Sequence, residues 1–215
     1  MPSDARNAWA QVLWIGGAPD AGKSTVAAIL AEHHDLVLYN CDRADEAHHR
    51  RLAQIMPEYD EFLSASLDER WVQPTPEQLF ARAVRSFAAR FPLLTEDLCE
   101  LGRAKTILVE GFSVTPGLVE PLLLSPRQAI WLIPTAQFKK ASVERRNKPS
   151  FRFATGDPER VRSNLLARDA LLCAYIREQA ESRNLTVLEV DGSSTTEELA
   201  TLIASHFAPW LNSRE

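Results

Sequence analysis

One stretch near the N-terminus has the residue types and spacing that bind nucleotide phosphates. Residues 17–24 read Gly-Ala-Pro-Asp-Ala-Gly-Lys-Ser and match the pattern G-x-x-x-x-G-K-[ST], between an apolar run and an amphipathic one. Glycines let the backbone turn its amides onto phosphate oxygens, and the N-terminus of the following helix adds a favourable dipole. The residues of this phosphate loop, expected to cradle ATP, are Gly17, Ala18, Pro19, Asp20, Ala21, Gly22, Lys23, Ser24 and Thr25.

Two side chains of the phosphate loop have expected roles. Lys23 would reach the β- and γ-phosphates, and Ser24 would place its hydroxyl on Mg²⁺, a hard cation that takes few protein ligands. The alternative is a glycine-rich turn with a solvated lysine. The pattern leaves open whether the γ-phosphate goes to water, to a small acceptor or nowhere, because one phosphate cradle serves many functions.

Two acidic residues follow other apolar runs. Asp42 comes after the run 36–41, so it is expected at the carboxyl edge of a sheet, beside the phosphate loop, where it could orient an acceptor. Its alternative role is to cap the next helix through Asp42-x-x-Asp45. Glu110 ends the run 106–109 and precedes Gly111; it could hold Mg²⁺ through water or polarise an attacking group, or make only a loop hydrogen bond.

The segment 139–152 holds six basic residues and one acid, which makes it the strongest positive patch of the chain. Arginines of a closing lid stabilise the charge that spreads over a transferring phosphoryl group and exclude water, whereas a solvated basic face is the alternative. The lid candidates are Arg145, Arg146 and Arg152. On the long helix that follows, Arg168 shares a face with Asn164, near Asp169, and could face the nucleotide or the acceptor, or form a surface ion pair.

Two other groups of residues are given structural roles. Asp45, His48 and His49 lack metal-ligand spacing and are predicted to be exposed polar residues of a helix. Four aromatic residues are assigned to the core rather than to a base-stacking platform: Trp71, Phe87, Phe91 and Trp131.

The elements that must position these residues alternate along the chain. Short apolar runs predict strands at 12–16, 36–41, 106–109, 129–133 and 185–190. Helices are predicted from Thr75, which heads a Thr-Pro-Glu-Gln capping box, and at about 158–183 and 195–207. This order predicts an α/β fold with a parallel sheet and ligands beyond the carboxyl ends of the strands. The stretch 56–102 is too long for a simple crossover and is interpreted as a helical insertion that covers the acceptor.

Composition sets limits on the class of protein. The 215 residues fit a single domain, and 45% apolar with 25% charged residues is ordinary for a globular protein. Three widely spaced cysteines predict a reducing cytoplasm, and no run is apolar enough to cross a membrane. The net charge of −5 would repel nucleic acid.

Two classes of phosphate-loop protein lack support. A GTPase would carry Asn-Lys-x-Asp, whereas residues 147–150 read Asn-Lys-Pro-Ser without the carboxylate, and an AAA-type motor would need a further helical domain. The chain instead resembles the small-molecule and nucleotide kinase branch of P-loop NTPases, which includes adenylylsulfate, gluconate, shikimate, uridine and nucleoside monophosphate kinases. The resemblance rests on Gly16–Thr25, Asp42, Glu110-Gly111 and the arginine-rich stretch.

The resemblance implies a three-layer fold with a five-stranded parallel sheet, an insertion at about 56–102 and a lid at about 145–158. It also implies that Asp42 binds the acceptor hydroxyl or takes its proton, and that Arg168 corresponds to the arginine after the lid. The expected catalytic residues are Lys23, Asp42, Glu110, Arg146 and Arg152, with Ser24 and Glu110 serving Mg²⁺.

The resulting hypothesis is an ATP- and Mg²⁺-dependent kinase that moves the γ-phosphate to a hydroxyl of a small molecule. A nucleoside monophosphate kinase is one alternative, because an acceptor that already carries a phosphate needs arginines more than a base. The other is an ATP-binding regulator or toxin-like module that serves a protein partner.

Overall fold

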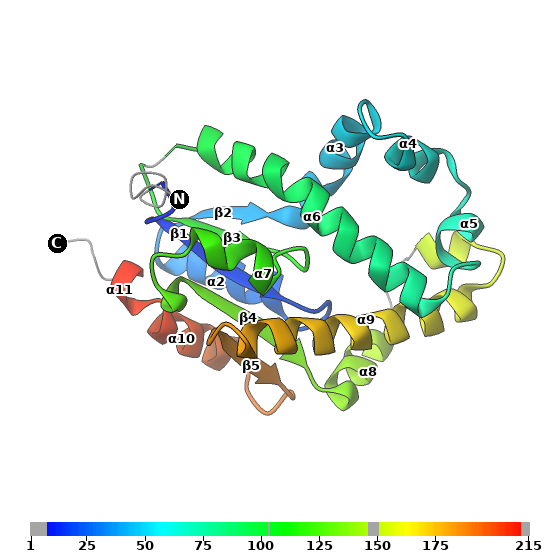
Figure 1. Cartoon of the computed structure of the whole chain (residues 1–215). Coiled ribbons are helices and arrows are strands. Elements are labelled where there is room, and N and C mark those ends of the chain that lie inside the picture. Colours follow the sequence, from blue (N-terminus) through cyan, green and yellow to red (C-terminus); the bar gives the residue numbers. More distant parts are fainter. Residues whose placement is uncertain (1–7, 103, 146–150, 212–215) are drawn as a thin grey trace.

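The computed structural model describes residues 8–102, 104–145 and 151–211. Its centre is a five-stranded, all-parallel sheet with the strand order β2-β3-β1-β4-β5 (Figure 1). The strands are β1 (Val12–Gly17), β2 (Val37–Asn40), β3 (Ile107–Glu110), β4 (Ala129–Pro134) and β5 (Thr186–Val190). All five predicted strands are confirmed, and their ends differ from the prediction by one residue at most.

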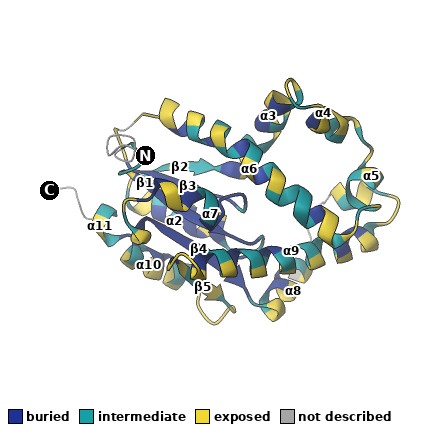
Figure 2. Cartoon of the chain, in the orientation of Figure 1, coloured by how far each residue is buried: buried dark blue, intermediate teal, exposed yellow. Residues whose placement is uncertain are grey.

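The sheet is buried on both faces because successive strand residues enter two separate cores. In β1, Trp14 packs into one hydrophobic cluster and Leu13 and Ile15 into the other. The first cluster lies under α6 (Pro76–Glu100), α7 (Pro116–Val119) and α9 (Pro158–Glu181); the second lies under α2 (Lys23–His33) and α10 (Thr196–His206). Figure 2 shows the dark, buried central strands β3, β1 and β4 between these helical layers, which confirms the predicted three-layer α/β fold.

Local capping fixes where the long helices begin. Thr75 accepts a hydrogen bond from the Gln78 amide while the Gln78 side chain accepts one from the Thr75 amide, so the predicted capping box starts α6. Asp157 accepts from the Arg160 amide at the start of α9. Thr195 and Glu198 form a further capping box before α10. These three predicted helices are confirmed.

Three helices fill the predicted insertion after α3 (Cys41–Ala53): α4 (Pro57–Ser64), α5 (Leu67–Trp71) and α6. Figure 1 shows α3, α4 and α5 beyond the carboxyl ends of the strands, which is the side where a ligand is expected. The remaining elements are η1 (Glu120–Leu122), η2 (Pro126–Gln128), α8 (Ala136–Arg145), η3 (Phe151–Ala154) and α11 (Ala208–Leu211). Across the described ranges, no helix is long and apolar enough to cross a bilayer.

Candidate functional site

The phosphate loop turns sharply between β1 and α2. Gly17 has φ 123°, and a Cβ there would lie 2.0 Å from the Leu132 carbonyl oxygen, so a side chain is excluded. Asp20 and Gly22 have φ of 64° and 80°, and Gly22 is the N-cap of α2. Left-handed residues within such a loop turn successive backbone amides toward one side, which makes a concave anion site at a helix N-terminus.

Lys23 lies across this loop. Its ammonium Nζ donates to the carbonyl oxygen of Ala18 at 2.8 Å, and the side chain is buried. Burial lowers the pKa of Lys23, while the nearby carboxylates of Glu110 and Asp42 oppose that change. Lys23 and the two predicted acidic residues are therefore close enough to interact.

Glu110 ends β3 and is only 1% exposed. Its Oε1 accepts a hydrogen bond from Nδ2 of Asn40, which pairs with it in register at the end of β2. Burial raises the pKa of Glu110, whereas the Ser24 hydroxyl and the Lys23 charge act to lower it. Glu110 is thus held by Asn40 at the edge of the sheet, near Ser24 and Lys23.

The Ser24 and Glu110 pair fits a magnesium ion. Ser24 is exposed, and Oε2 of Glu110 is buried without a hydrogen bond of standard geometry from the described part of the chain. A buried carboxylate oxygen of this kind calls for a cation or a water molecule. Mg²⁺ keeps most of its waters and takes one or two protein oxygens, which is what these two side chains offer.

Asp42 lies in the first turn of α3, with its side chain still open to solvent. The surrounding protein raises the pKa of this carboxyl, and the charges of Lys23 and Arg90 oppose that shift. Asn40, not Asp42, caps α3 by accepting from the Arg43 amide, so the capping alternative was wrong. Asp42 is thus left available for a ligand beside Lys23.

Lys139 does not lie on a solvated basic face, which was the alternative role for the segment 139–152. The residue is buried, and its Nζ lies 2.6 Å from a carboxylate oxygen of Asp20 in the phosphate loop and 2.6 Å from one of Asp169 on α9. Asp169 in turn accepts from Arg168 Nε at 2.9 Å. A buried chain of charges therefore connects the phosphate loop through α8 to α9, and Arg168 belongs to it rather than to a surface ion pair.

The lid candidates are placed in part. Arg145 ends α8, and Arg146 lies outside the described residues. Arg152 belongs to η3, with its guanidinium 4.6 Å from the ring centre of Phe153. The neighbouring Phe151 packs on Trp71 of the insertion with ring centres 5.1 Å apart.

Two further contacts attach this region to the insertion. The Gly156 amide donates to Asp68 of α5 at 2.8 Å. Asn164 of α9 donates to the carbonyl oxygen of Pro74 at 3.0 Å. The chain from η3 into α9 is therefore held against α5 and the start of α6.

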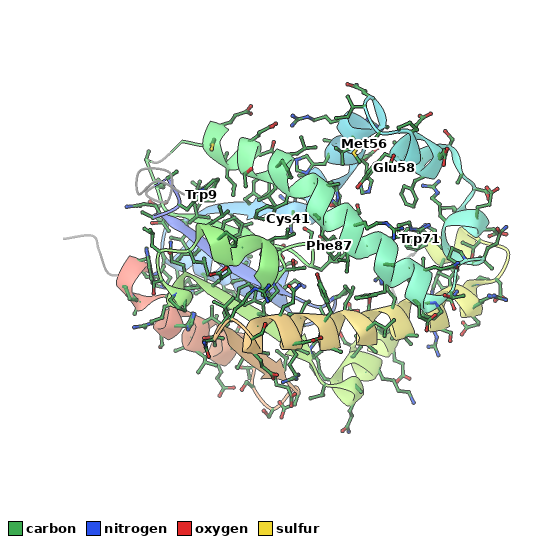
Figure 3. All side chains as sticks on the ribbon, viewed as in Figure 1. Trp9, Cys41, Met56, Glu58, Trp71 and Phe87 are labelled. Atoms are coloured by element: carbon green, nitrogen blue, oxygen red, sulfur yellow. The ribbon has the colours of Figure 1, made fainter. Side chains whose placement is uncertain are left out.

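A cavity of about 440 Å³ lies between α6 and the helices α3 to α5. It reaches the carboxyl edge of the sheet at Phe112, which follows Gly111, and at Arg90, whose charge acts on Asp42. Such a volume suits a small metabolite. Figure 3 labels four of the lining residues: Met56, Glu58, Trp71 and Phe87.

The structural roles assigned to two groups of residues need correction. His48 is buried and bonds through Nε2 to Asp97 at 2.8 Å, so it is not an exposed polar residue. Asp45 forms an ion pair with the buried Arg90. Trp71 lines the cavity rather than the core. Phe87 is a buried core residue as predicted, although it also lines the cavity, and Phe91 and Trp131 pack in the core as predicted.

Comparisons with known proteins find similarity in structure but not in sequence. No family model matches the chain, and no curated protein matches it. A gluconokinase from Sinorhizobium meliloti 1021 aligns with 14% identity over 94% of each chain and a TM-score of 0.46. A shikimate kinase from Acinetobacter baumannii, in complex with shikimate, aligns with 16% identity over 98% of this chain and 99% of that chain, with a TM-score of 0.43.

A third similar structure is an uncharacterized protein from Eubacterium ventriosum ATCC 27560, with 16% identity over 92% of this chain and 98% of that chain and a TM-score of 0.47. Gluconokinase and shikimate kinase are two of the kinase types that the sequence resembles. With TM-scores below 0.5, the fold is defined by the strand order and the phosphate loop of this chain rather than by these matches.

Several side chains of the candidate site were not singled out from the sequence. Asn40 holds Glu110 from the adjacent strand, and Arg90 joins the cavity to Asp42. Asn40 stands two residues before Asp42 near a predicted strand end, and a polar residue at this position is a signal of a site residue. Arg90 had no local signal, because it lies in the middle of a helix whose register only the folded chain reveals.

Proposed function

We propose that the protein is an ATP- and Mg²⁺-dependent phosphotransferase that moves the γ-phosphate to a hydroxyl group of a small molecule. The observation that carries this proposal is the meeting of Lys23, Asp42 and Glu110 beside a half-open cavity, with Ser24 at the same edge. A protein that only binds ATP would need neither a second carboxylate nor a cavity for an acceptor. The fold implied by the kinase resemblance also supports it.

The phosphate loop would hold the nucleotide. Its amides would bind the phosphates, and Lys23 would exchange its bond to the Ala18 carbonyl for the β- and γ-phosphate oxygens. Ser24 and Glu110 would hold Mg²⁺, directly or through water. When bound, this ion supplies positive charge that neutralises the transferring phosphoryl group.

Asp42 would act on the acceptor. As the acceptor hydroxyl gives its proton to the Asp42 carboxylate, the oxygen forms a bond to the γ-phosphorus and the bond from that phosphorus to the bridging oxygen breaks, leaving ADP. The elevated pKa of Asp42 makes the carboxylate a better proton acceptor than an ordinary aspartate. Lys23, Arg152 and Arg168, with Arg145 and Arg146, would balance the charge on the phosphoryl oxygens.

The test is ADP release from Mg·ATP in the presence of pooled hydroxyl metabolites and pooled nucleoside monophosphates. We expect release that depends on one of the pools and is lost in Lys23→Ala. The matched control is Lys140→Ala, which removes an exposed lysine of α8 and should leave the release unchanged. Binding of ATP without stimulation by any pool would contradict the proposal and favour an ATP-binding regulator.

A second candidate, a nucleoside monophosphate kinase, is favoured by the arginines that line the cavity. Arg82, Arg85 and Arg168 could bind an acceptor phosphate bidentately. The substitution Asp42→Asn separates the two candidates. It should lower transfer to an alcohol by about a hundredfold, whereas an acceptor whose attacking oxygen is already ionised needs no base and should retain most of its rate.

A further inference from the structure

We infer that the acceptor is an aromatic molecule carrying a negatively charged group, bound in the cavity between aromatic side chains and the arginines of α6. The inference rests on the proposed function and adds the class of substrate to it. Neither the phosphate loop nor the two acidic residues specify this class.

The walls of the cavity hold six rings in two groups. His49, Tyr59, Phe62 and Trp71 contact one another on α3 to α5, and Phe87 of α6 contacts Phe112 after β3. The rings of His49 and Phe62 are stacked with centres 5.7 Å apart, and Phe87 meets Phe112 edge to face at 5.2 Å. Aromatic walls of this kind favour a flat, apolar group over a polyhydroxylated one.

The charges of the cavity are unbalanced. Four arginines line it, against the two acids Asp45 and Glu58. Arg90 is paired with Asp45, and Arg168 with Asp169. Arg82 and Arg85 have no carboxylate at salt-bridge distance among the residues that the structure describes.

Arg82 lies where the aromatic residues and the arginines of the cavity meet. Its guanidinium lies 4.9 Å from the ring centre of Phe62 and 5.3 Å from that of Trp71, and it donates to the Arg70 carbonyl oxygen. Burial and the charges of Arg168, Arg70 and Arg85 lower its pKa. Positive charges that oppose one another in a partly buried site are relieved by an anion, and a guanidinium fork matches a carboxylate or a phosphate.

The spacing of the arginines along α6 indicates how far apart the hydroxyl and the charged group of the acceptor lie. Arg90, beside Asp42, and Arg82 are eight residues apart on one helix, which corresponds to about 12 Å along its axis. Asp42 would receive the hydroxyl at one end of the cavity, and Arg82 with Arg85 would receive the anion toward the other. A ring between the two groups would lie against Phe62, Phe87 and Trp71.

The test measures binding by calorimetry with Mg·ADP present, so that the phosphate loop is filled and cannot bind the probe. The probes are matched pairs: adenosine monophosphate with adenosine, and 4-(hydroxymethyl)benzoate with its methyl ester, with gluconate as a non-aromatic anion. We expect at least one aromatic anion to bind about tenfold or more tightly than its neutral counterpart and than gluconate. The two pairs distinguish a phosphate from a carboxylate.

Two variants report on the charges. Arg85→Gln removes an exposed guanidinium and should keep the fold, while Arg82→Gln also loses the bond to Arg70. Each should reduce the preference for the anion by about tenfold and leave the affinity of the neutral counterpart unchanged. Arg177→Gln, on the part of α9 that pairs with Glu189 of β5, is the control and should change neither affinity.

Equal affinity for charged and neutral probes, or tighter binding of gluconate than of every aromatic anion, would overturn the inference. Loss of ATP affinity in Arg85→Gln, without any change for the aromatic probes, would assign these arginines to the nucleotide and would also overturn it. Failure of the proposed function has a different signature: the aromatic anion binds with the expected preference, but ADP release from Mg·ATP is not stimulated by any acceptor.

Discussion

The phosphate loop and the acceptor cavity are neighbouring parts of one candidate site, but they are built in different ways. The loop is a single run of consecutive residues whose backbone supplies the binding groups, with left-handed conformations at Gly17, Asp20 and Gly22. The cavity draws its walls from α3, α4, α5, α6, the turn after β3 and α9. A loop of this kind is therefore built from residues that are close in sequence, whereas the walls of the cavity depend on tertiary packing.

Their electrostatics differ as well. In the loop region the buried cations Lys23 and Lys139 each lie near two carboxylates, so each cation has partners before any ligand arrives. In the cavity, Arg82 and Arg85 lack such partners within the described part of the chain. A cation with a carboxylate partner is already stabilised, while one without gains more free energy when an anion binds.

The largest expected effect belongs to the loop. Lys23→Ala removes the ammonium that would contact the β- and γ-phosphates, and kcat/KM for ATP should fall by about a thousandfold. Steady-state kinetics of ADP release measures it. A fall of less than tenfold would mean that the phosphate loop does not take part in the phosphoryl transfer.

The next effect concerns the buried charges that connect the loop to α9. Asp169→Asn leaves Lys139 and Arg168 without their shared carboxylate and should lower the free energy of unfolding by about 3 kcal/mol. Urea denaturation measures the change. Glu159→Gln, which removes an exposed partner of Arg162 on the same helix, is the control and should leave the midpoint unchanged.

Asp42→Asn should lower kcat by about a hundredfold for a hydroxyl acceptor, because the proton then lacks a general base. The pH profile sharpens this prediction. Since the surroundings raise the pKa of Asp42 and the carboxylate form is the active one, kcat/KM should fall as pH is lowered through a pKa above that of an ordinary aspartate. That acidic limb should be absent in Asp42→Asn; its persistence would assign the titration to another group.

The smallest effect belongs to the cavity wall. Trp71→Ala removes a ring that contacts both Phe62 and Phe151, and it should raise the KM for the acceptor by about tenfold while leaving the KM for ATP unchanged. Kinetics with each substrate varied in turn separates the two. Equal changes in both KM values would show that loop and cavity are not independent parts.

The same contrast explains what could be predicted from the sequence. Strand ends and the capping box at Thr75 depend on neighbours within a few residues, and they were predicted to within one residue. Lys139 was misjudged because its partners Asp20 and Asp169 lie 119 and 30 residues away in the chain. His48 was misjudged for the same reason, since it pairs with Asp97.

The residues of the cavity were harder still. Trp71 and Phe87 are large and apolar, which predicts burial but not whether they face a core or a cavity. Arg82 and Arg90 carry no pattern that separates them from solvated helix arginines. Only the packing of α6 against α3 to α5 reveals that these side chains share one space.

The central claim is that the loop and the cavity serve one transfer reaction, and phosphorus NMR of a reaction with Mg·ATP and a stimulating acceptor tests it most directly. We expect one new phosphate ester signal for each ADP formed, absent in Lys23→Ala and strongly reduced in Asp42→Asn. ADP accompanied only by free inorganic phosphate would contradict it, because the γ-phosphate would then be going to water and the cavity would not hold the acceptor.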